Sequence, residues 1–358
     1  MRRAAGLWRR MAQVQVAGLL LVAGAQAGAG CELPAGFGAV PPAFEPRGTG
    51  VEVWKFEGGG ELLKDLVLFR LDPQLWAPKV VDMREISVAM ARRKVHTQPA
   101  FSVREILDLQ AGEAVAITAG FTQVLNAPVP AGLLMSDLVE HAPAFKSSRV
   151  MDGHVCVRPG GGLDLLSMLT GKDRRAPDNA AGCRDAVQAG PVLVEAGEPQ
   201  VKAHQLKSAR VAVGAYQDGK FLIGYSSMAT TYALSCVMAH PAIGARWAIN
   251  LQGDAYGSVA FSKGLAAQAG VTPLGSPDQT VASAIVFNRQ RQPAPQQRTV
   301  SLDSAPDSRS PGPVLTRPAP DNRSGSSLGG GGLGSSSGRG TSQAPIWTCA
   351  DSRNSKCR

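Results

Sequence analysis

The chain has 358 residues, a formal net charge of +9 and 44% hydrophobic residues. The positive charge lies at the two ends: residues 1–27 hold four arginines and no acid, and residues 289–358 hold ten basic and four acidic residues. Residues 28–288 therefore contain one more acidic than basic residue, a net charge of −1, which argues against a nucleic-acid-binding surface on the folded part.

The N-terminus has the pattern of an export signal. Four arginines fall within residues 1–10, an apolar run follows from Val14 to Ala23, and Ala25-Gln26-Ala27 supplies small residues for cleavage. This order predicts a signal peptide over residues 1–27, cleaved after Ala27, and hence a periplasmic or secreted protein. The apolar run is shorter than the roughly 20 residues of a spanning helix, so we expect no stable membrane span.

Six cysteines remain after this cleavage, and an exported protein can oxidise them to disulfides. Cys156 and Cys183 flank a stretch rich in Gly, Pro and charged residues, and a disulfide between them would join the two ends of this stretch. Cys349 and Cys357 bracket a short basic loop and would pair locally. Lipidation of Cys31 is the less favoured alternative, because Gly28 stands where a lipoprotein site has a larger apolar residue. No C-x-x-C spacing supports a zinc site, and we predict neither a metal nor a cofactor.

The first half of the core predicts strands and one helix. Residues 51–56 alternate as a strand, and residues 66–71 form another that ends before Pro73. Ser102 and Glu105 have the spacing of a capping box, so a helix should run to about Leu109. A buried strand is expected at residues 114–117.

The second half is expected to contain more strands and a second helix. Ala189-Gly190-Pro191 predicts a turn into a strand at residues 192–194. Residues 210–213 and 220–223 should form a hairpin around Asp218-Gly219. A helix is expected from Thr231 to about His240, and a buried strand at residues 247–251. Strands dominate over the two helices, which indicates an α+β fold with a strand-rich mixed core.

From about Gln290 the sequence becomes rich in Pro, Gly and Ser. Such a segment buries too little apolar surface to offset the entropy of ordering it, so residues 289–358 are predicted to be a disordered tail. Residues 28–288, roughly 260 residues, then form one domain.

Common catalytic motifs do not occur: there is no G-x-S-x-G, H-E-x-x-H, P-loop or G-x-G-x-x-G. The five histidines are scattered and are interpreted as structural or surface residues. Gly160-Gly161-Gly162 precedes no phosphate-binding helix and is expected to be a loop.

A set of five strand-end segments remains, at residues 117–122, 130–137, 188–193, 209–214 and 249–254. In this order and spacing they resemble the phosphodiester glycosidase family over roughly residues 50–290, with residues 141–182 resembling an insertion. The resemblance implies a hydrolase of that fold, acting on a saccharide or sugar-phosphodiester ligand.

The resemblance also implies a site. The arginine of the family's Arg-x-Ala-x-Gly segment is Arg210, whose planar fork suits a phosphodiester. The family's Asn-Leu-Asp-Gly-Gly segment falls on Asn250 to Asp254, so that Gln252 takes the acidic position and Gly253 follows it. Where the family has a segment that begins with Asn-Gly, this chain has Thr118 to Thr122, which begins with Thr118. The predicted substrate-binding residues are therefore Arg210, Gln252, Thr118, Asn250 and Gly253.

Gln252 changes the expected chemistry, because an amide neither donates a catalytic proton nor carries negative charge. Asp254 is the predicted substitute, although on a regular strand it would lie about 6–7 Å from position 252. Asp137 is the second predicted catalytic carboxylate.

Three functions remain open. The first is an exported phosphodiester glycosidase that acts on a sugar phosphodiester or envelope polysaccharide. The second is a catalytically degenerate saccharide-binding protein with the same fold. The third is an interaction protein of the envelope whose tail reaches a partner.

Overall fold

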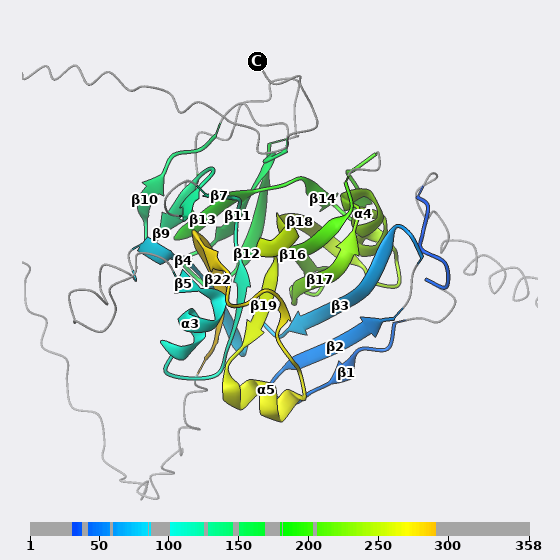
Figure 1. The fold of residues 1–358 in the computed structure, drawn as a ribbon, viewed down its shortest axis with the longest axis horizontal. Helices are drawn as coiled ribbons and strands as arrows, with labels where there is room; N and C mark the ends of the chain where they lie inside the picture. Colours follow the sequence, from blue (N-terminus) through cyan, green and yellow to red (C-terminus); the bar gives the residue numbers. More distant parts are fainter. Residues whose placement is uncertain are drawn as a thin grey trace, which may run out of the picture. The chain divides into compact units, whose positions relative to one another are not determined.

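The computed structural model describes residues 31–37, 42–57, 60–84, 86, 101–124, 128–145, 150–168, 180, 182–202 and 206–290 (Figure 1). The predicted signal peptide, most of the predicted tail and the Cys349–Cys357 pair lie outside these residues. Among the described helices, none has the length and apolar character needed to cross a membrane.

The largest element is an eight-stranded antiparallel sheet that combines early and late segments of the core. Its order is β1-β2-β3-β17-β16-β18-β14-β15. The strands are β1 (Glu45–Pro46), β2 (Val51–Phe56), β3 (Leu63–Leu71), β17 (Phe221–Ala229), β16 (Ser208–Tyr216), β18 (Ala245–Gly253), β14 (Val192–Glu195) and β15 (Glu198–Pro199).

Two five-stranded antiparallel sheets complete the core. One has the order β10 (Val139–Ala142), β9 (Leu134–Ser136), β13 (Asp185–Ala189), β11 (Gly153–Val157) and β12 (Leu163–Ser167). The other has the order β20 (Leu274–Gly275), β19 (Ser258–Phe261), β6 (Ala114–Thr118), β22 (Ser283–Arg289) and β4 (Trp76–Asp82). Two short ladders pair β21 (Thr280–Val281) with β5 (Phe101–Ser102) and β7 (Thr122–Val124) with β8 (Pro128–Pro130).

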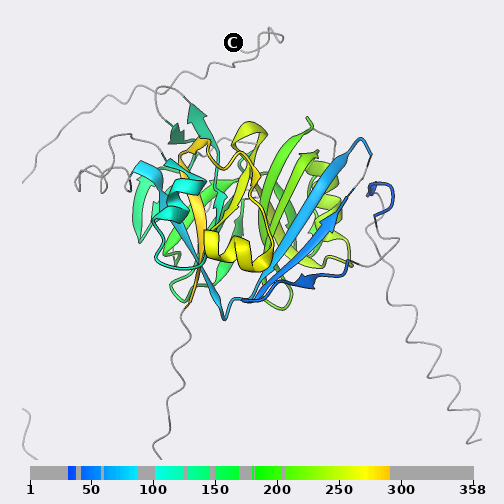
Figure 2. The same ribbon diagram turned by 60° about the horizontal axis from the view of Figure 1, so that its bottom comes forward.

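Apolar residues from all three sheets form the main core cluster. Alternate residues of β16, such as Val211 and Val213, join this cluster, whereas Ala212 belongs to a second cluster on the other face of the large sheet. Helix α4 (Thr231–Ala239) buries its apolar side in that second cluster. Figures 1 and 2 show α4 beside the upper part of the large sheet.

The other two helices pack elsewhere. Helix α3 (Val103–Asp108) covers β6 and β22 through a third apolar cluster. Helix α5 (Lys263–Ala269) places Leu265 and Ala269 in the main cluster, and it lies at the front in Figure 2. The α+β, strand-rich prediction is confirmed.

Local sequence signals account for several elements. At α3, the Ser102 hydroxyl accepts a hydrogen bond from the Glu105 N–H at 3.2 Å, and the Glu105 carboxylate accepts one from the Ser102 N–H at 2.8 Å. This is the predicted capping box. The hairpin around Asp218-Gly219 is also present, as β16 and β17, and Gly160–Gly162 lies in the turn between β11 and β12.

Two disulfides tie distant segments together. Cys156 at β11 bonds Cys183, which precedes β13, as the sequence predicted. Cys31 bonds Cys236 in α4, a pairing that the sequence left open. The second bond fastens the start of the described chain to the helix over the large sheet.

Candidate functional site

The candidate site is built around the end of β18, where Arg210 on β16 pairs directly with Gly253. A Cβ atom at position 253 would lie 2.8 Å from Nη1 of Arg210. A side chain there would displace the guanidinium, and glycine therefore allows Arg210 to lie across the neighbouring strand.

Main-chain carbonyl groups hold the guanidinium in place. Nη2 of Arg210 donates to the Leu206 carbonyl at 2.9 Å, and Nε lies 3.4 Å from the Ala229 carbonyl. Among the described residues, none accepts a hydrogen bond from Nη1, so this nitrogen can donate to a ligand. Burial lowers the pKa of Arg210, while the carboxylate of Asp254 acts in the opposite direction.

Asp254 follows Gly253 directly and is exposed to solvent. It opens a 3-10 helix, η1 (Asp254–Tyr256), with a left-handed φ of 56°. β18 therefore does not continue to Asp254 as a regular strand, and the displacement expected from strand geometry does not apply. Asp254 is close enough to Arg210 to stabilise its charge.

Thr118 supports this turn from β6. Its hydroxyl donates to the Tyr256 carbonyl at 2.8 Å and lies 2.9 Å from the Ser258 hydroxyl. Thr118 is fully buried, and these contacts occupy its hydroxyl. Its place beside η1 makes it a residue that positions the turn carrying Asp254.

A β-bulge in β18, just before Gln252, sets which residue of β16 Gln252 faces. Val211 pairs with Gln252 and Ala212 pairs with Asn250, so that Leu251 is the extra residue. Paired residues of antiparallel strands share a face, and successive residues alternate between faces. Gln252 therefore lies on the face of Val211, opposite to that of Arg210.

Asn250 is completely buried and supports the turn before β14. Its amide donates to the Gly190 carbonyl at 2.8 Å, and its backbone N–H donates to the Pro191 carbonyl at 3.0 Å. The Gly190–Pro191 peptide bond is cis. Asn250 thus joins two of the sequence-predicted segments, at residues 188–193 and 249–254.

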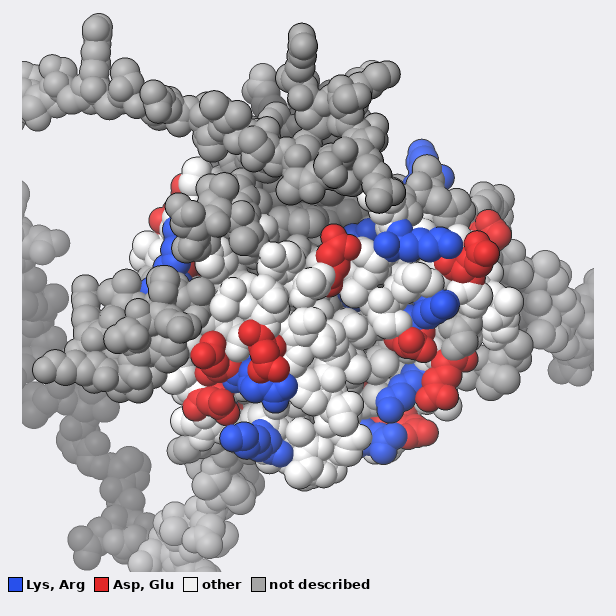
Figure 3. Space-filling model, in the orientation of Figure 1, with Lys and Arg blue, Asp and Glu red and all other residues white. Residues whose placement is uncertain are grey.

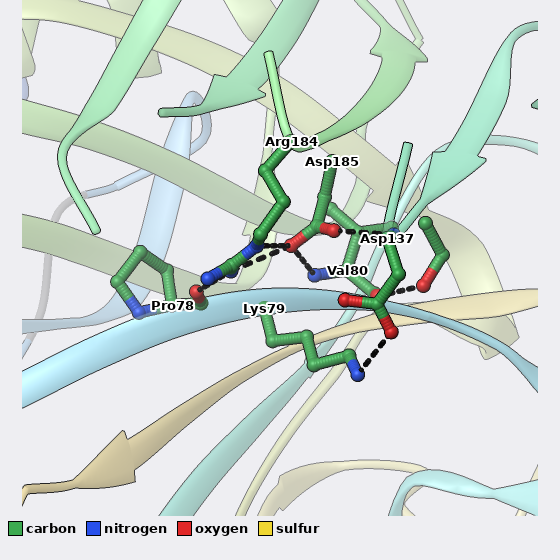
Figure 4. A network of polar contacts seen from close by, with 7 residues as sticks. Pro78, Lys79, Val80, Asp137, Arg184 and Asp185 are labelled. Atoms are coloured by element: carbon green, nitrogen blue, oxygen red, sulfur yellow. Dashed lines mark hydrogen bonds and ion pairs between the residues drawn. The ribbon is translucent and has the colours of Figure 1, made fainter. Parts of the chain in front are cut away.

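Asp137 lies in a different part of the fold, in the turn between β9 and β10 (Figure 4). Its carboxylate pairs with Lys79 at 2.7 Å, and its backbone N–H donates to Asp185 at 2.8 Å. Asp185 is fully buried and also accepts from Arg184 at 2.7 Å and from the Val80 N–H at 3.3 Å. Of the two predicted carboxylates, Asp254, and not Asp137, acts on the pKa of Arg210.

The charges on the described surface are mixed. In Figure 3, acidic and basic side chains stand next to one another over the face that is shown. Within the described residues, no group of three or more His, Cys, Asp and Glu side chains is arranged to hold a metal. His154 is fully buried, and burial lowers its pKa to about 4, so it is neutral at neutral pH.

Some parts of the site have no sequence signal. The carbonyl groups of Leu206 and Ala229 act through the main chain, so residue type does not reveal them. Asp152 accepts the Val192 N–H at 2.7 Å beside the Gly190–Pro191 turn, and burial raises its pKa to about 6. The one sequence signal for Asp152 is that it is a lone acid two residues before His154, next to a buried strand, where a carboxyl group can be perturbed.

Comparison with protein-family models identifies the domain. Residues 111–288 match the model of the phosphodiester glycosidase family, which confirms the resemblance found from the strand-end segments. Thr118, Arg210, Gln252 and Asp254 all lie within the matched range. No curated protein sequence matches the chain.

Several solved structures are similar at low identity. The zebrafish N-acetylglucosamine-1-phosphodiester alpha-N-acetylglucosaminidase catalytic domain, auto-inhibited by its pro-peptide, is 14% identical, with a TM-score of 0.45 over 67% of this chain and 82% of that chain. A hypothetical protein from Synechocystis is 12% identical, with a TM-score of 0.44 over 66% of this chain and 62% of that chain. A protein of Burkholderia pseudomallei assigned as exported is 12% identical, with a TM-score of 0.38 over 62% of this chain and 73% of that chain.

Proposed function

We propose, from the premise that residues 111–288 are a phosphodiester glycosidase domain, that the chain binds a sugar phosphodiester at the end of β18 and cleaves its glycosidic bond. The observation that carries this proposal is the position of Arg210. Its guanidinium is held over Gly253 by carbonyl groups, its Nη1 is not engaged by a described residue, and Asp254 lies nearby.

Each residue has a distinct role in this proposal. Arg210 donates hydrogen bonds to the phosphate, and its fixed position lowers the entropy lost when the ligand binds. Asp254 supplies the carboxylate that glycosidic cleavage requires for proton transfer or for stabilising positive charge on the sugar. Thr118 and Asn250 keep the surrounding turns in place through the bonds described above.

Binding without turnover is the second candidate, and Gln252 favours it. The family's acidic position holds a side chain that cannot titrate, on the face of the sheet opposite to Arg210. Most glycosidases use two carboxyl groups, whereas Asp254 is the one predicted catalytic carboxylate whose charge acts on Arg210. Such a protein would recognise an envelope saccharide and leave it intact.

Turnover of an N-acetylglucosamine-1-phosphodiester substrate separates the two candidates. We expect the purified mature protein to release the sugar, and Asp254→Asn to lower the rate by about 10²–10⁴-fold. Asp218→Asn, in the exposed turn between β16 and β17, is the matched control and should keep the wild-type rate. If the wild type releases no sugar from a panel of such diesters but gains thermal stability from them, binding without turnover is the better assignment.

The proposed place of action is outside the cytosol. Two disulfides within the described residues fit an oxidising compartment, and the predicted signal peptide provides the route. Sequencing the N-terminus of the secreted protein tests this: it should begin at Gly28. Retention of the Met1 end in the mature protein would contradict it.

A further inference from the structure

A cavity of about 320 Å³ borders the Cys31–Cys236 disulfide, and both cysteines contribute to its lining. The other lining residues come from the β14–β15 hairpin, the turn between β16 and β17, the end of α4 and the start of β18. Figure 1 shows α4 beside β14, on the side of the large sheet where this cavity lies. Its volume is at the lower end of the range of small-molecule sites.

This cavity is separate from the proposed phosphate site. Ala245, the first residue of β18, lines the cavity and pairs with Tyr216. Gly253, the last residue of β18, pairs with Arg210. Since β18 has nine residues, the two ends lie about 25 Å apart along the strand. The cavity therefore has no part in the roles assigned to Arg210 and Asp254.

The two disulfides differ in how a reagent can approach them. Cys31 is partly exposed, and the cavity reaches both Cys31 and Cys236. Cys156 and Cys183 are 0% and 2% exposed, and both belong to an apolar cluster. Thiol–disulfide exchange begins when a thiolate attacks an accessible sulfur. The Cys31–Cys236 bond is therefore the one that a small thiol can attack in the folded protein, at Cys31.

Two carboxylates make the hairpin beside this cavity acidic. Glu198 of β15 lines the cavity, and Glu195 of β14 is its direct partner across the hairpin. Like charges that face each other across a ladder repel. Neither acid forms an ion pair with a described residue. A cation bound at Glu198 would relieve this repulsion.

The rest of the lining adds no positive charge. Helix α4 ends at the cavity, where its last carbonyl groups carry partial negative charge. Nδ1 of His240 accepts a hydrogen bond from the Ala242 N–H at 3.2 Å, so the ring is neutral. Among the described lining residues there is no Lys or Arg. The cavity therefore favours a ligand with a positive charge.

We propose that this cavity binds a small aminothiol, a thiol that carries an ammonium group, and that Cys31 is the residue it modifies. The ammonium group lies at Glu198, and the thiolate attacks Sγ of Cys31. A sulfur–sulfur bond forms between the ligand and Cys31, and the Cys31–Cys236 bond breaks. The electron pair passes to Sγ of Cys236, which takes a proton from water.

A second aminothiol completes the exchange. It attacks the mixed disulfide at the ligand sulfur, so that Cys31 leaves as a thiol and the two ligands leave as their own disulfide. Two aminothiols are oxidised and one protein disulfide is reduced. The exchange removes the covalent bond between residues 31–37 and α4, while the edge-on contacts of the Phe37 ring with Trp54 and Phe56 need no disulfide.

Three thiols of similar size test the site: cationic cysteamine, uncharged mercaptoethanol and anionic mercaptoethanesulfonate. The oxidised mature protein reacts with each, acid stops the reaction, and peptide mass spectrometry follows both disulfides. We expect Cys31–Cys236 to open at least about tenfold faster than Cys156–Cys183, with the first adduct on Cys31, because access controls the attack.

Glu198→Gln tests the recognition of the ammonium group. Since an exposed ion pair is weak, this variant should slow cysteamine about two- to fivefold and leave mercaptoethanol unchanged. It should speed the reaction of mercaptoethanesulfonate. Glu61→Gln is the matched control, because Glu61 is an exposed acid near the opposite end of the large sheet, and it should match the wild type with all three thiols.

Two results would overturn the proposal. Equal rates of opening for the two disulfides, or a first adduct on Cys236, would show that Cys31 is not an exchange site. Equal cysteamine rates for the wild type and Glu198→Gln would show that the cavity does not recognise an ammonium group.

Discussion

Arg210 and Gly253 depend on each other: the guanidinium occupies the space that a side chain at position 253 would fill. A Cβ atom added to Gly253 would lie 2.8 Å from Nη1, and the Ala209 carbonyl and the Ser208 hydroxyl would each lie 3.2 Å from it. The guanidinium is the far end of a flexible side chain, so it is the group that must move.

Gly253→Ala should therefore displace Arg210 without unfolding the domain. We expect at least a roughly tenfold loss of affinity for a sugar phosphodiester, since charge-assisted hydrogen bonds to the phosphate are weakened. Gly264→Ala is the control, because a Cβ there meets nothing within 4 Å, and on helix α5 it should stabilise by about 0.5–1 kcal/mol. Unchanged affinity in Gly253→Ala would show that the position of Arg210 does not determine binding.

Gln252→Asp tests whether the missing carboxylate limits turnover. If the family's framework is intact around this position, an acid there should raise the rate of sugar release by about 10²-fold or more. Gln252→Asn shortens the side chain equally and adds no charge, so it should leave the rate unchanged. Equal rates for Asp and Asn at position 252 would mean that a carboxylate here is not what the site lacks.

Asp152 should make stability depend on pH. Burial raises its pKa from 3.8 to about 6, so the ionised carboxylate destabilises the folded state. This destabilisation is absent below pH 3.8, develops as the pH rises, and is complete above about pH 6. Asp152→Asn should therefore stabilise the protein at about pH 8 by about 1–3 kcal/mol and have little effect near pH 4.

Urea unfolding at the two pH values measures this difference. Asp164→Asn is a suitable comparison. The Asp164 side chain is half-exposed and forms an ion pair with Arg158 at 2.9 Å, near the surface. That pair should contribute under about 1 kcal/mol. A gain in Asp152→Asn of the same size at both pH values would contradict a pKa raised by burial.

The Cys31–Cys236 disulfide should stabilise the core and leave Cys31 without a lipid. It joins residues 205 positions apart, so Cys236→Ser should lower the free energy of unfolding by about 2–4 kcal/mol. A sulfur bonded to Cys236 cannot also carry a thioether lipid, and the intact mass of the mature protein should include none. Identical melting of the wild type and Cys236→Ser, or a lipid mass on Cys31, would disprove the bond.

Local patterns in the sequence determined many of the elements. The period of two in residues 51–56 predicted β2, the Ser102–Glu105 spacing predicted the start of α3, and Asp218-Gly219 predicted the hairpin of β16 and β17. These signals act over a few residues, where backbone geometry and side-chain hydrogen bonds decide the conformation. The order of strand-end segments was enough to recognise the phosphodiester glycosidase family.

Tertiary structure decided how the site residues are grouped. A bulge at Leu251 turned Gln252 to the face opposite Arg210, and a left-handed residue at position 254 ended β18 directly after Gly253, the residue that pairs with Arg210. Asp137, which has the same side chain as Asp254, forms an ion pair with Lys79 instead. Strand register and bulges depend on pairing between segments far apart in the chain, so residue types alone cannot show which carboxylate meets which arginine.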